Sequence, residues 1–190
     1  MQTSAASSRS PKSNHCPLMK KTSLVLALIA FAAAASAQPP AASAPQTPPA
    51  PPARGLPLDL ALEAARVAVD TCKGLDQKVG VSILDSAGEL RLLLAADGAA
   101  TRGVQNSALK AKAALAFNIP SGQVAERVKT DKDVADRLAA NPTWLARAGA
   151  VPVSVGGTVI GAIGVGGARG SEKDEACAIA GLDKVKSRLY

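Results

Sequence analysis

Apolar residues recur every three or four positions near both ends of residues 57–190, which is the period of an amphipathic helix. The first such stretch predicts a helix that begins at Leu58 and ends at Gly74. Its charged residues fall on the side opposite its apolar stripe, so we expect the stripe to be buried. The stripe consists of Leu58, Leu62, Ala65, Val69 and Cys72.

The last helix is predicted to run from Ser171 towards Leu189. On a helical projection, Cys177 lies roughly opposite the apolar stripe of this helix, beside Lys184 and Arg188. We therefore expect Cys177 to face away from the core. The stripe itself consists of Ile179, Leu182, Val185 and Leu189.

Two segments between these helices have the pattern of β-hairpins. Residues 79–96 hold two strand-like runs around a turn at 85–88, and residues 151–165 do the same around Gly156 and Gly157. A further helix is predicted over 101–118, and residues 121–149 are polar and weakly helical. Strands joined by tight turns are antiparallel. We therefore expect an α+β fold, with an antiparallel four- to five-stranded sheet built from two hairpins and packed with N- and C-terminal helices and intervening helices.

Glycines cluster before the last predicted helix, in GAIGVGGARGSEKDEACA at 161–178. The outline resembles a phosphate-binding loop, but the spacing of Gly164, Gly166 and Gly170 misses the dinucleotide fingerprint by one residue, and no G-K-[ST] follows. Acidic side chains in the first turn of the helix would also repel a phosphate. The stretch therefore predicts a tight strand-to-helix turn.

The N-terminal third of the chain has the features of an exported protein. Residues 19–37 contain two lysines, an apolar run and an Ala35-Ser-Ala37 cleavage site, which predict a signal peptide within an N-terminal extension over 1–37. The apolar run is short for a membrane span, which needs about 20 residues. We expect a periplasmic or secreted protein with no membrane anchor after cleavage. Translation could begin at Met1 or Met19, and residues 38–56 form a Pro/Ala-rich linker before the domain at 57–190.

Cleavage after Ala37 changes the composition of the protein. It removes four of the 22 basic residues and none of the 15 acidic ones, so the formal charge falls from +7 to +3. The remaining basic residues are scattered and only 2% of the chain is aromatic, so we expect no nucleic-acid partner. The only histidine and both methionines are also lost, which excludes a Ser-His-Asp triad and the commonest zinc sites. No catalytic residue and no site for a bound metal ion is predicted.

A series of short motifs runs through the predicted domain, namely Val81-Ser-Ile-Leu-Asp85, Gly88, Asp97-Gly98, Lys112-Ala113, Pro152, Gly161-Ala-Ile-Gly-Val165, Gly167-Ala168 and Asp174-Glu-Ala-Cys-Ala178. Together they resemble the GlcG/HbpS-like family, also described as a haem-degrading domain. The resemblance covers nearly all of 57–190 and is most specific towards the C-terminus. It implies a small domain that binds a small molecule such as haem and that often forms homo-oligomers. Members often carry serine where this chain has Gly166, so any ligand contact from that hydroxyl would be absent.

Haem binding requires cations for the propionates and usually an axial His, Met, Cys or Tyr. After cleavage, only Cys72, Cys177 and Tyr190 remain of the usual axial ligands, with Thr101 and Lys110 as weaker substitutes. We therefore expect any haem site to be weakly ligated, shallow or shared between subunits. The candidate partners of the propionates are Arg102, Lys110 and Lys112, each of which could instead lie on a solvated helix face.

Cys72 and Cys177 would share an oxidising compartment, where cysteines commonly pair. Because Cys177 is placed opposite the apolar stripe, the sequence favours a buried Cys72 and a free or intermolecular Cys177 over an intrachain disulfide. The main functional hypothesis is a secreted haem- or tetrapyrrole-binding module. The alternatives are an enzyme or sensor that acts on a small organic ligand, and a non-catalytic homo-oligomeric interaction module.

Overall fold

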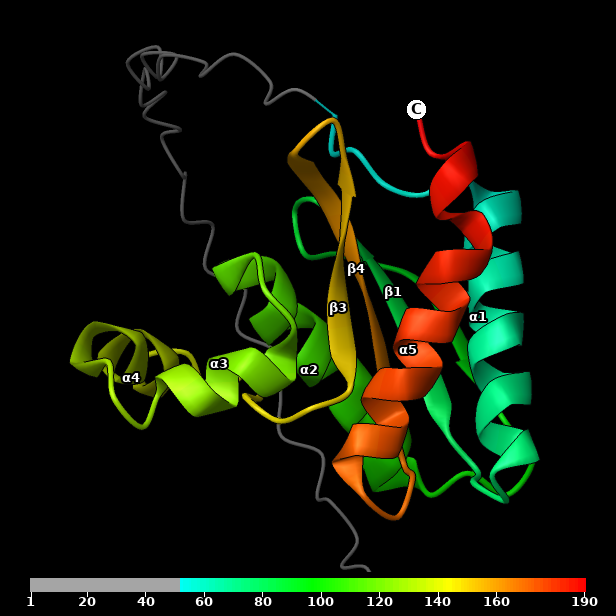
Figure 1. Ribbon diagram of the computed structural model, residues 1–190, viewed down its shortest axis with the longest axis horizontal. Coiled ribbons are helices and arrows are strands. Elements are labelled where there is room, and N and C mark those ends of the chain that lie inside the picture. Colours follow the sequence, from blue (N-terminus) through cyan, green and yellow to red (C-terminus); the bar gives the residue numbers. More distant parts are fainter. Residues whose placement is uncertain (1–51) are drawn as a thin grey trace, which may run out of the picture. The chain divides into compact units, whose positions relative to one another are not determined.

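The computed structural model describes residues 52–190. The predicted extension and signal peptide at 1–37 and most of the predicted linker lie outside the described residues. The described part confirms the α+β prediction, with four strands (Figure 1). No helix within it is long and apolar enough to cross a membrane. Its elements are α1 (Leu58–Gly74), β1 (Gly80–Asp85), β2 (Leu90–Ala95), α2 (Thr101–Phe117), α3 (Ser121–Arg127), α4 (Lys132–Ala139), β3 (Ala150–Val155), β4 (Thr158–Gly166), α5 (Ser171–Val185) and the short 3-10 helix η1 (Lys186–Arg188).

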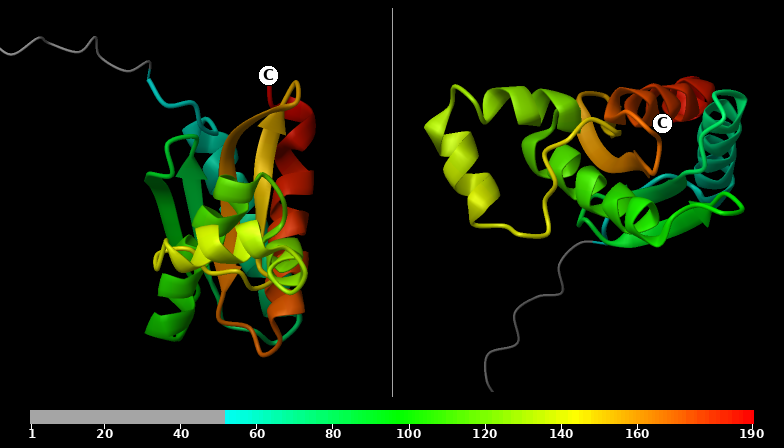
Figure 2. Two further views of the ribbon diagram at one scale, coloured as in Figure 1. Left: turned by 90° about the vertical axis from the view of Figure 1, so that its left-hand side faces the viewer. Right: turned by 90° about the horizontal axis from the view of Figure 1, so that it is seen from below.

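The two hairpins join into one antiparallel sheet with the strand order β2-β1-β4-β3. β1 and β4 meet at the centre, where Gly80 pairs with Gly166 and Ile83 with Ile163. Every residue of β1 is buried because both faces of the sheet centre are covered. α1 and α5 lie side by side over one face, and α2 packs on the opposite face. α3 and α4 extend beyond the sheet, away from α1 (Figure 2).

Small residues form the contact between α1 and α5. A Cβ atom placed on Gly181 would lie 2.5 Å from the carbonyl oxygen of Ala64, so the two helices touch backbone to backbone at this level. The predicted stripes are therefore partly wrong. Leu58, Leu62 and Ile179 are 64%, 45% and 43% exposed, because the close approach selects alanine, glycine and cysteine for the interface rather than large aliphatic side chains.

Cys72 of α1 and Cys177 of α5 form a disulfide, with an S–S distance of 2.11 Å and Cα atoms 5.7 Å apart. The preference for a free Cys177 was wrong, as was its placement away from the core, since both cysteines are fully buried. The error follows from the rotation of α5, whose buried face includes Asp174, Cys177 and Gly181 as well as Val185 of the predicted stripe. Neither sulfur is a thiol that could ligate iron.

The glycine cluster forms a strand-to-helix turn, as predicted, and brings β4 close to α2. A Cβ on Gly166 would lie 2.4 Å from the carbonyl oxygen of Gly103, and one on Gly103 would lie 2.6 Å from the Cα of Gly167. Position 166 therefore has no room for a side chain with this backbone. Serine, frequent here in the family that the sequence resembles, would require α2 to move.

Candidate functional site

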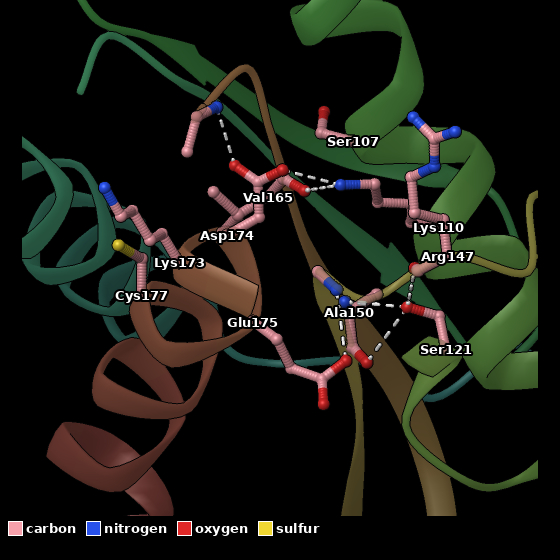
Figure 3. A network of polar contacts seen from close by, with 12 residues as sticks. Ser107, Lys110, Ser121, Arg147, Ala150, Val165, Lys173, Asp174, Glu175 and Cys177 are labelled. Carbon is pink, nitrogen blue, oxygen red and sulfur yellow. Dashed lines mark hydrogen bonds and ion pairs between the residues drawn. The ribbon is translucent and has the colours of Figure 1, made fainter. Parts of the chain in front are cut away.

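A buried ion pair links α2 to the first turn of α5. Lys110 Nζ lies 2.6 Å from Asp174 Oδ2, and each side chain is 3% exposed. Lys110 also donates to the carbonyl oxygen of Val165, at 3.2 Å, while Asp174 Oδ1 accepts from the backbone N–H of Ala168, at 2.9 Å (Figure 3). Buried charges need such additional hydrogen bonds to offset their desolvation. The pair therefore connects α2, the end of β4 and α5, and its two charges cancel.

Space for the lysine ammonium comes from Gly149. Its φ is +137°, and a Cβ at this position would lie 2.6 Å from Lys110 Nζ. A glycine is required here for two reasons, because the backbone lies outside the usual range of other residues and the volume belongs to the lysine. The residue just before strand β3 thus contributes to the packing of the ion pair.

A second carboxylate fixes the loop that leads into β3. Glu175 Oε2 accepts hydrogen bonds from the backbone N–H groups of Gly122 and Gly149, both at 3.1 Å. Ser121 Oγ donates to the carbonyl oxygen of Arg147 at 2.7 Å and accepts from the N–H of Ala150 at 2.9 Å. These contacts hold the backbone of Arg147 in place.

Above the ion pair is a pocket of about 350 Å³, which we call the arginine pocket. A second pocket of about 400 Å³, the adjoining pocket, shares Ala100 and Gly167 with it. The arginine pocket is lined by Ala100, Arg102, Gly103, Asn106, Lys110, Leu145, Arg147, Gly167, Ala168, Ser171 and Asp174. The adjoining pocket is lined by Asp76, Gln77, Lys78, Gly98, Ala100, Gly167 and Arg169.

The arginine pocket carries a net positive charge. Arg102 and Arg147 are exposed, and among the residues that the structure describes neither takes part in an ion pair. The charges of Lys110 and Asp174 cancel at the floor. Two guanidinium groups over a neutral floor favour an anionic ligand, and guanidinium groups bind carboxylates through paired hydrogen bonds.

The structure divides the residues proposed from sequence among several places. Arg102 and Lys110 line the arginine pocket, but Lys110 is committed to Asp174. Thr101 is exposed at the first residue of α2 and does not line this pocket. Lys112 lines a different pocket, and the fully exposed Tyr190 lines a smaller one near the end of the chain.

Sequence reasoning missed Arg147 and the partnership of Asp174 with Lys110. Arg147 lies in a loop with no hydrophobic period, and no motif marks it. In the sequence, Asp174 is one of several acidic residues at the start of a helix, and nothing there marks it as a partner of Lys110. The G-A-x-G-x-x-x-D spacing that leads to it was visible, but its lysine partner is 64 residues away in the chain.

A family model described as "Haem degrading protein HbpS-like" matches residues 56–183, which is most of the chain. The chain belongs to the HbpS-like family. A crystal structure of HbpS is 30% identical to this HbpS-like chain, with a TM-score of 0.66, and the match covers 75% of this chain and 98% of HbpS. A double mutant of HbpS from Streptomyces reticuli gives 30% identity and a TM-score of 0.65, over 78% of this chain and 99% of that one.

More distant structures share the fold of this HbpS-like chain. ORFY from Klebsiella pneumoniae is 23% identical, with a TM-score of 0.65 over 76% of this chain and 99% of ORFY. A complex of PduOC with haem is 20% identical, with a TM-score of 0.61 over 68% of this chain and 94% of PduOC. No curated protein sequence gave a significant match.

The residues of this HbpS-like chain fit one part of haem better than the other. Arg102 and Arg147 line one pocket, and their charge suits carboxylates such as those of haem. The iron finds no usual ligand in residues 52–190, because these contain no histidine or methionine, Cys72 and Cys177 are bonded to each other, and Tyr190 lies in another pocket. The described residues therefore match a tetrapyrrole through its carboxylates and not through its metal.

Proposed function

We propose that this HbpS-like chain binds haem or a related tetrapyrrole in the arginine pocket, with the macrocycle extending over the adjoining pocket. The observation that carries the proposal is the pair of exposed guanidinium groups of Arg102 and Arg147 over a neutral floor, neither of which forms an ion pair within the described part of the chain. Membership of the HbpS-like family supports it. The PduOC complex adds that a related fold accommodates haem in that protein.

The shape of the site is consistent with a flat ligand. Pockets for organic ligands commonly measure about 300–1,000 Å³, and a tetrapyrrole needs more room than the 350 Å³ of the arginine pocket alone. The boundary between the two pockets is formed by Ala100 and Gly167, which project little or no side chain. A planar macrocycle could pass over this boundary without displacing a side chain.

Each residue of the site has a physical role in this proposal. Arg102, from the first turn of α2, and Arg147, from the loop before β3, each bind one carboxylate. Lys110 and Asp174 keep the floor rigid and uncharged. Haem when bound would supply redox chemistry, but no residue role here depends on the iron. The metal-free protoporphyrin is therefore expected to bind with an affinity similar to that of haemin.

A haemin titration of the purified protein, followed by the Soret difference spectrum, tests the proposal. Loss of one charged hydrogen-bonding partner costs about 1.5 kcal/mol, so Arg102→Gln and Arg147→Gln should each raise the Kd roughly tenfold. Arg127→Gln is the matched control, since Arg127 is an exposed arginine at the end of α3, outside the arginine pocket. Equal affinities for all four proteins would contradict the proposal, as would a linear response without saturation.

We also propose that the protein is exported and cleaved after Ala37. The basic residues, apolar run and small-residue site of 19–37 support this. Mass spectrometry of the protein from the periplasmic or culture fraction should find an N-terminus at Gln38. An intact residue 19–37 segment on the mature protein would contradict it.

Self-association is the second candidate property, in line with the predicted homo-oligomer. Six large aliphatic side chains of the described residues are at least 43% exposed. Exposed apolar side chains that gather into a patch mark interaction sites. The six are Leu58, Leu62, Leu75, Leu90, Leu93 and Ile179. Light scattering after size exclusion should give a mass above that of one chain, and Leu62→Gln or Leu93→Gln should lower it.

A further inference from the structure

A third pocket, of about 400 Å³, lies where the β1–β2 turn meets the C-terminal half of α2. It shares no residue with the arginine pocket or the adjoining pocket. We call it the tryptophan pocket, because Trp144 is the only tryptophan of the chain. The residues used below are Glu89 from the turn, Lys112, Leu115 and Ala116 from α2, and Thr143 and Trp144 from the loop after α4.

Neighbouring side chains and one backbone hydrogen bond hold the Trp144 side of this pocket in place. The ring of Phe117 meets Trp144 edge to face, with centroids 5.7 Å apart and planes at 79°. Arg137 stacks over the Phe117 ring at 4.6 Å and donates to the carbonyl oxygen of Ala116. The backbone N–H of Leu145 donates to the carbonyl oxygen of Leu109. This hydrogen bond attaches the loop that carries Trp144 to α2. A ligand would meet an indole ring that is already positioned.

The opposite wall is equally fixed. The buried carboxylate of Asp85 accepts from the N–H groups of Ala87 and Glu89, at 2.9 and 3.0 Å, and so closes the β1–β2 turn. Ser86 forms two hydrogen bonds with Arg54 of the segment before α1. Its Oγ accepts from the backbone N–H of Arg54, and its own N–H donates to the carbonyl oxygen of Arg54. Preorganised walls reduce the conformational entropy that a ligand must overcome on binding.

The chemistry of the lining indicates the class of ligand. Lys112, Leu115 and Ala116 share one face of α2, so a half-buried lysine side chain lies beside an apolar floor. Among residues 52–190, Lys112 takes part in no ion pair. An indole ring favours a flat aromatic partner, and the ammonium favours one carboxylate. The carboxylate of Glu89 on the same pocket disfavours a second negative charge.

We propose that the tryptophan pocket is a second ligand site, which binds a small flat aromatic molecule carrying a single carboxylate. The ring stacks on Trp144 above Leu115, and the carboxylate pairs with Lys112. The lining of the tryptophan pocket places one lysine beside a glutamate, whereas the lining of the arginine pocket holds two arginines that form no ion pair within residues 52–190. It does not depend on tetrapyrrole binding.

The test uses naphthoate as the probe and the indole N–H resonance of Trp144 as the reporter. Since the chain has one tryptophan, its indole signal in a proton–nitrogen correlation spectrum reports on this pocket alone. Naphthoate should shift the signal saturably. The uncharged naphthamide and the doubly charged naphthalene dicarboxylate should each bind about tenfold more weakly, as expected when one charged hydrogen bond is lost or an anion is added.

Substitutions in the protein test whether Lys112 binds the carboxylate of naphthoate. Lys112→Gln should abolish the preference for naphthoate over naphthamide, whereas Lys129→Gln, an exposed lysine paired with Glu126, should keep it. Arg102→Gln should also keep it, which separates this site from the arginine pocket. No saturable shift, equal binding of naphthoate and naphthamide, or an unchanged preference in Lys112→Gln would overturn the proposal. If Lys112→Gln does not fold, the comparison of probes on the unaltered protein decides the matter.

Discussion

At the scale of single residues, the site depends on charged groups that the fold has removed from water. Lys110 and Asp174 are each 3% exposed, and the pair is stable only because Val165, Ala168 and Gly149 complete its surroundings. Removing one partner of such a buried ion pair strongly destabilises the protein, because the other charge stays buried without a partner.

Asp174→Asn should therefore lower the free energy of unfolding by about 3–5 kcal/mol, measured by urea denaturation. The physical reason is an uncompensated Lys110 ammonium. Replacing both charges with apolar side chains, in Lys110→Met with Asp174→Leu, should recover most of the loss. Asp136→Asn is the control, because its pair with Lys132 is exposed and should contribute at most about 1 kcal/mol. Equal losses in Asp174→Asn and Asp136→Asn would show that burial does not set the strength of the pair.

At the scale of helices and strands, local patterns in the sequence predicted most elements but not their orientation. The period of three to four residues located α1 and α5, and the turn glycines located both hairpins. The same period identified the buried faces of α1 and α5 only in part, since Val69, Cys72 and Val185 are buried as predicted but other members of the stripes are exposed. Hydrophobicity favoured Leu58, Leu62 and Ile179, whereas the contact between the helices is made by smaller residues. That choice depends on the distance between two helices far apart in the sequence, which a local pattern does not contain.

The candidate site shows the same division. The sequence identified Arg102 and Lys110 on one helix, because a helical face is a local property. The sequence did not predict that Arg147 and Asp174 lie in the same pocket, because these two residues belong to a loop and to the last helix. The disulfide was misjudged for a related reason, because the position of Cys177 on α5 follows from the rotation that Gly181 permits.

The close contact between α1 and α5 makes Gly181 sensitive to added volume. Gly181→Ala should destabilise the protein by about 1–3 kcal/mol, because its Cβ would press on the backbone oxygen of Ala64, which has no side-chain freedom to move away. Gly74→Ala is a matched control at the end of α1, where a Cβ would meet no atom within 4 Å. Thermal or urea unfolding of both variants measures the difference. Equal stability of the two variants would contradict the account of the helix contact.

At the scale of the whole described domain, two connections hold α5 to the rest of the fold. The Cys72–Cys177 disulfide joins it to α1 on one face of the sheet, and the Asp174–Lys110 pair joins it to α2 on the other. Asp174 and Cys177 are three residues apart, so both connections leave from neighbouring turns of one helix. The arginines of the proposed ligand site come from α2 and the loop before β3, and neither connects directly to the disulfide.

This arrangement separates stability from ligand binding. The disulfide spans 105 residues, and closing a loop of about 100 residues is expected to contribute up to about 4.7 kcal/mol, within a usual range of about 2–5. Cys72→Ala with Cys177→Ala should lower the free energy of unfolding by that amount, and a reductant should lower the stability of the unaltered protein but not of the variant.

At a temperature where the variant is folded, its haemin Kd should stay within about twofold of the original, as expected for distant and independent sites. An unchanged stability would contradict the disulfide, whereas a large loss of haemin affinity in the folded variant would show that the position of α5 controls the arginine pocket.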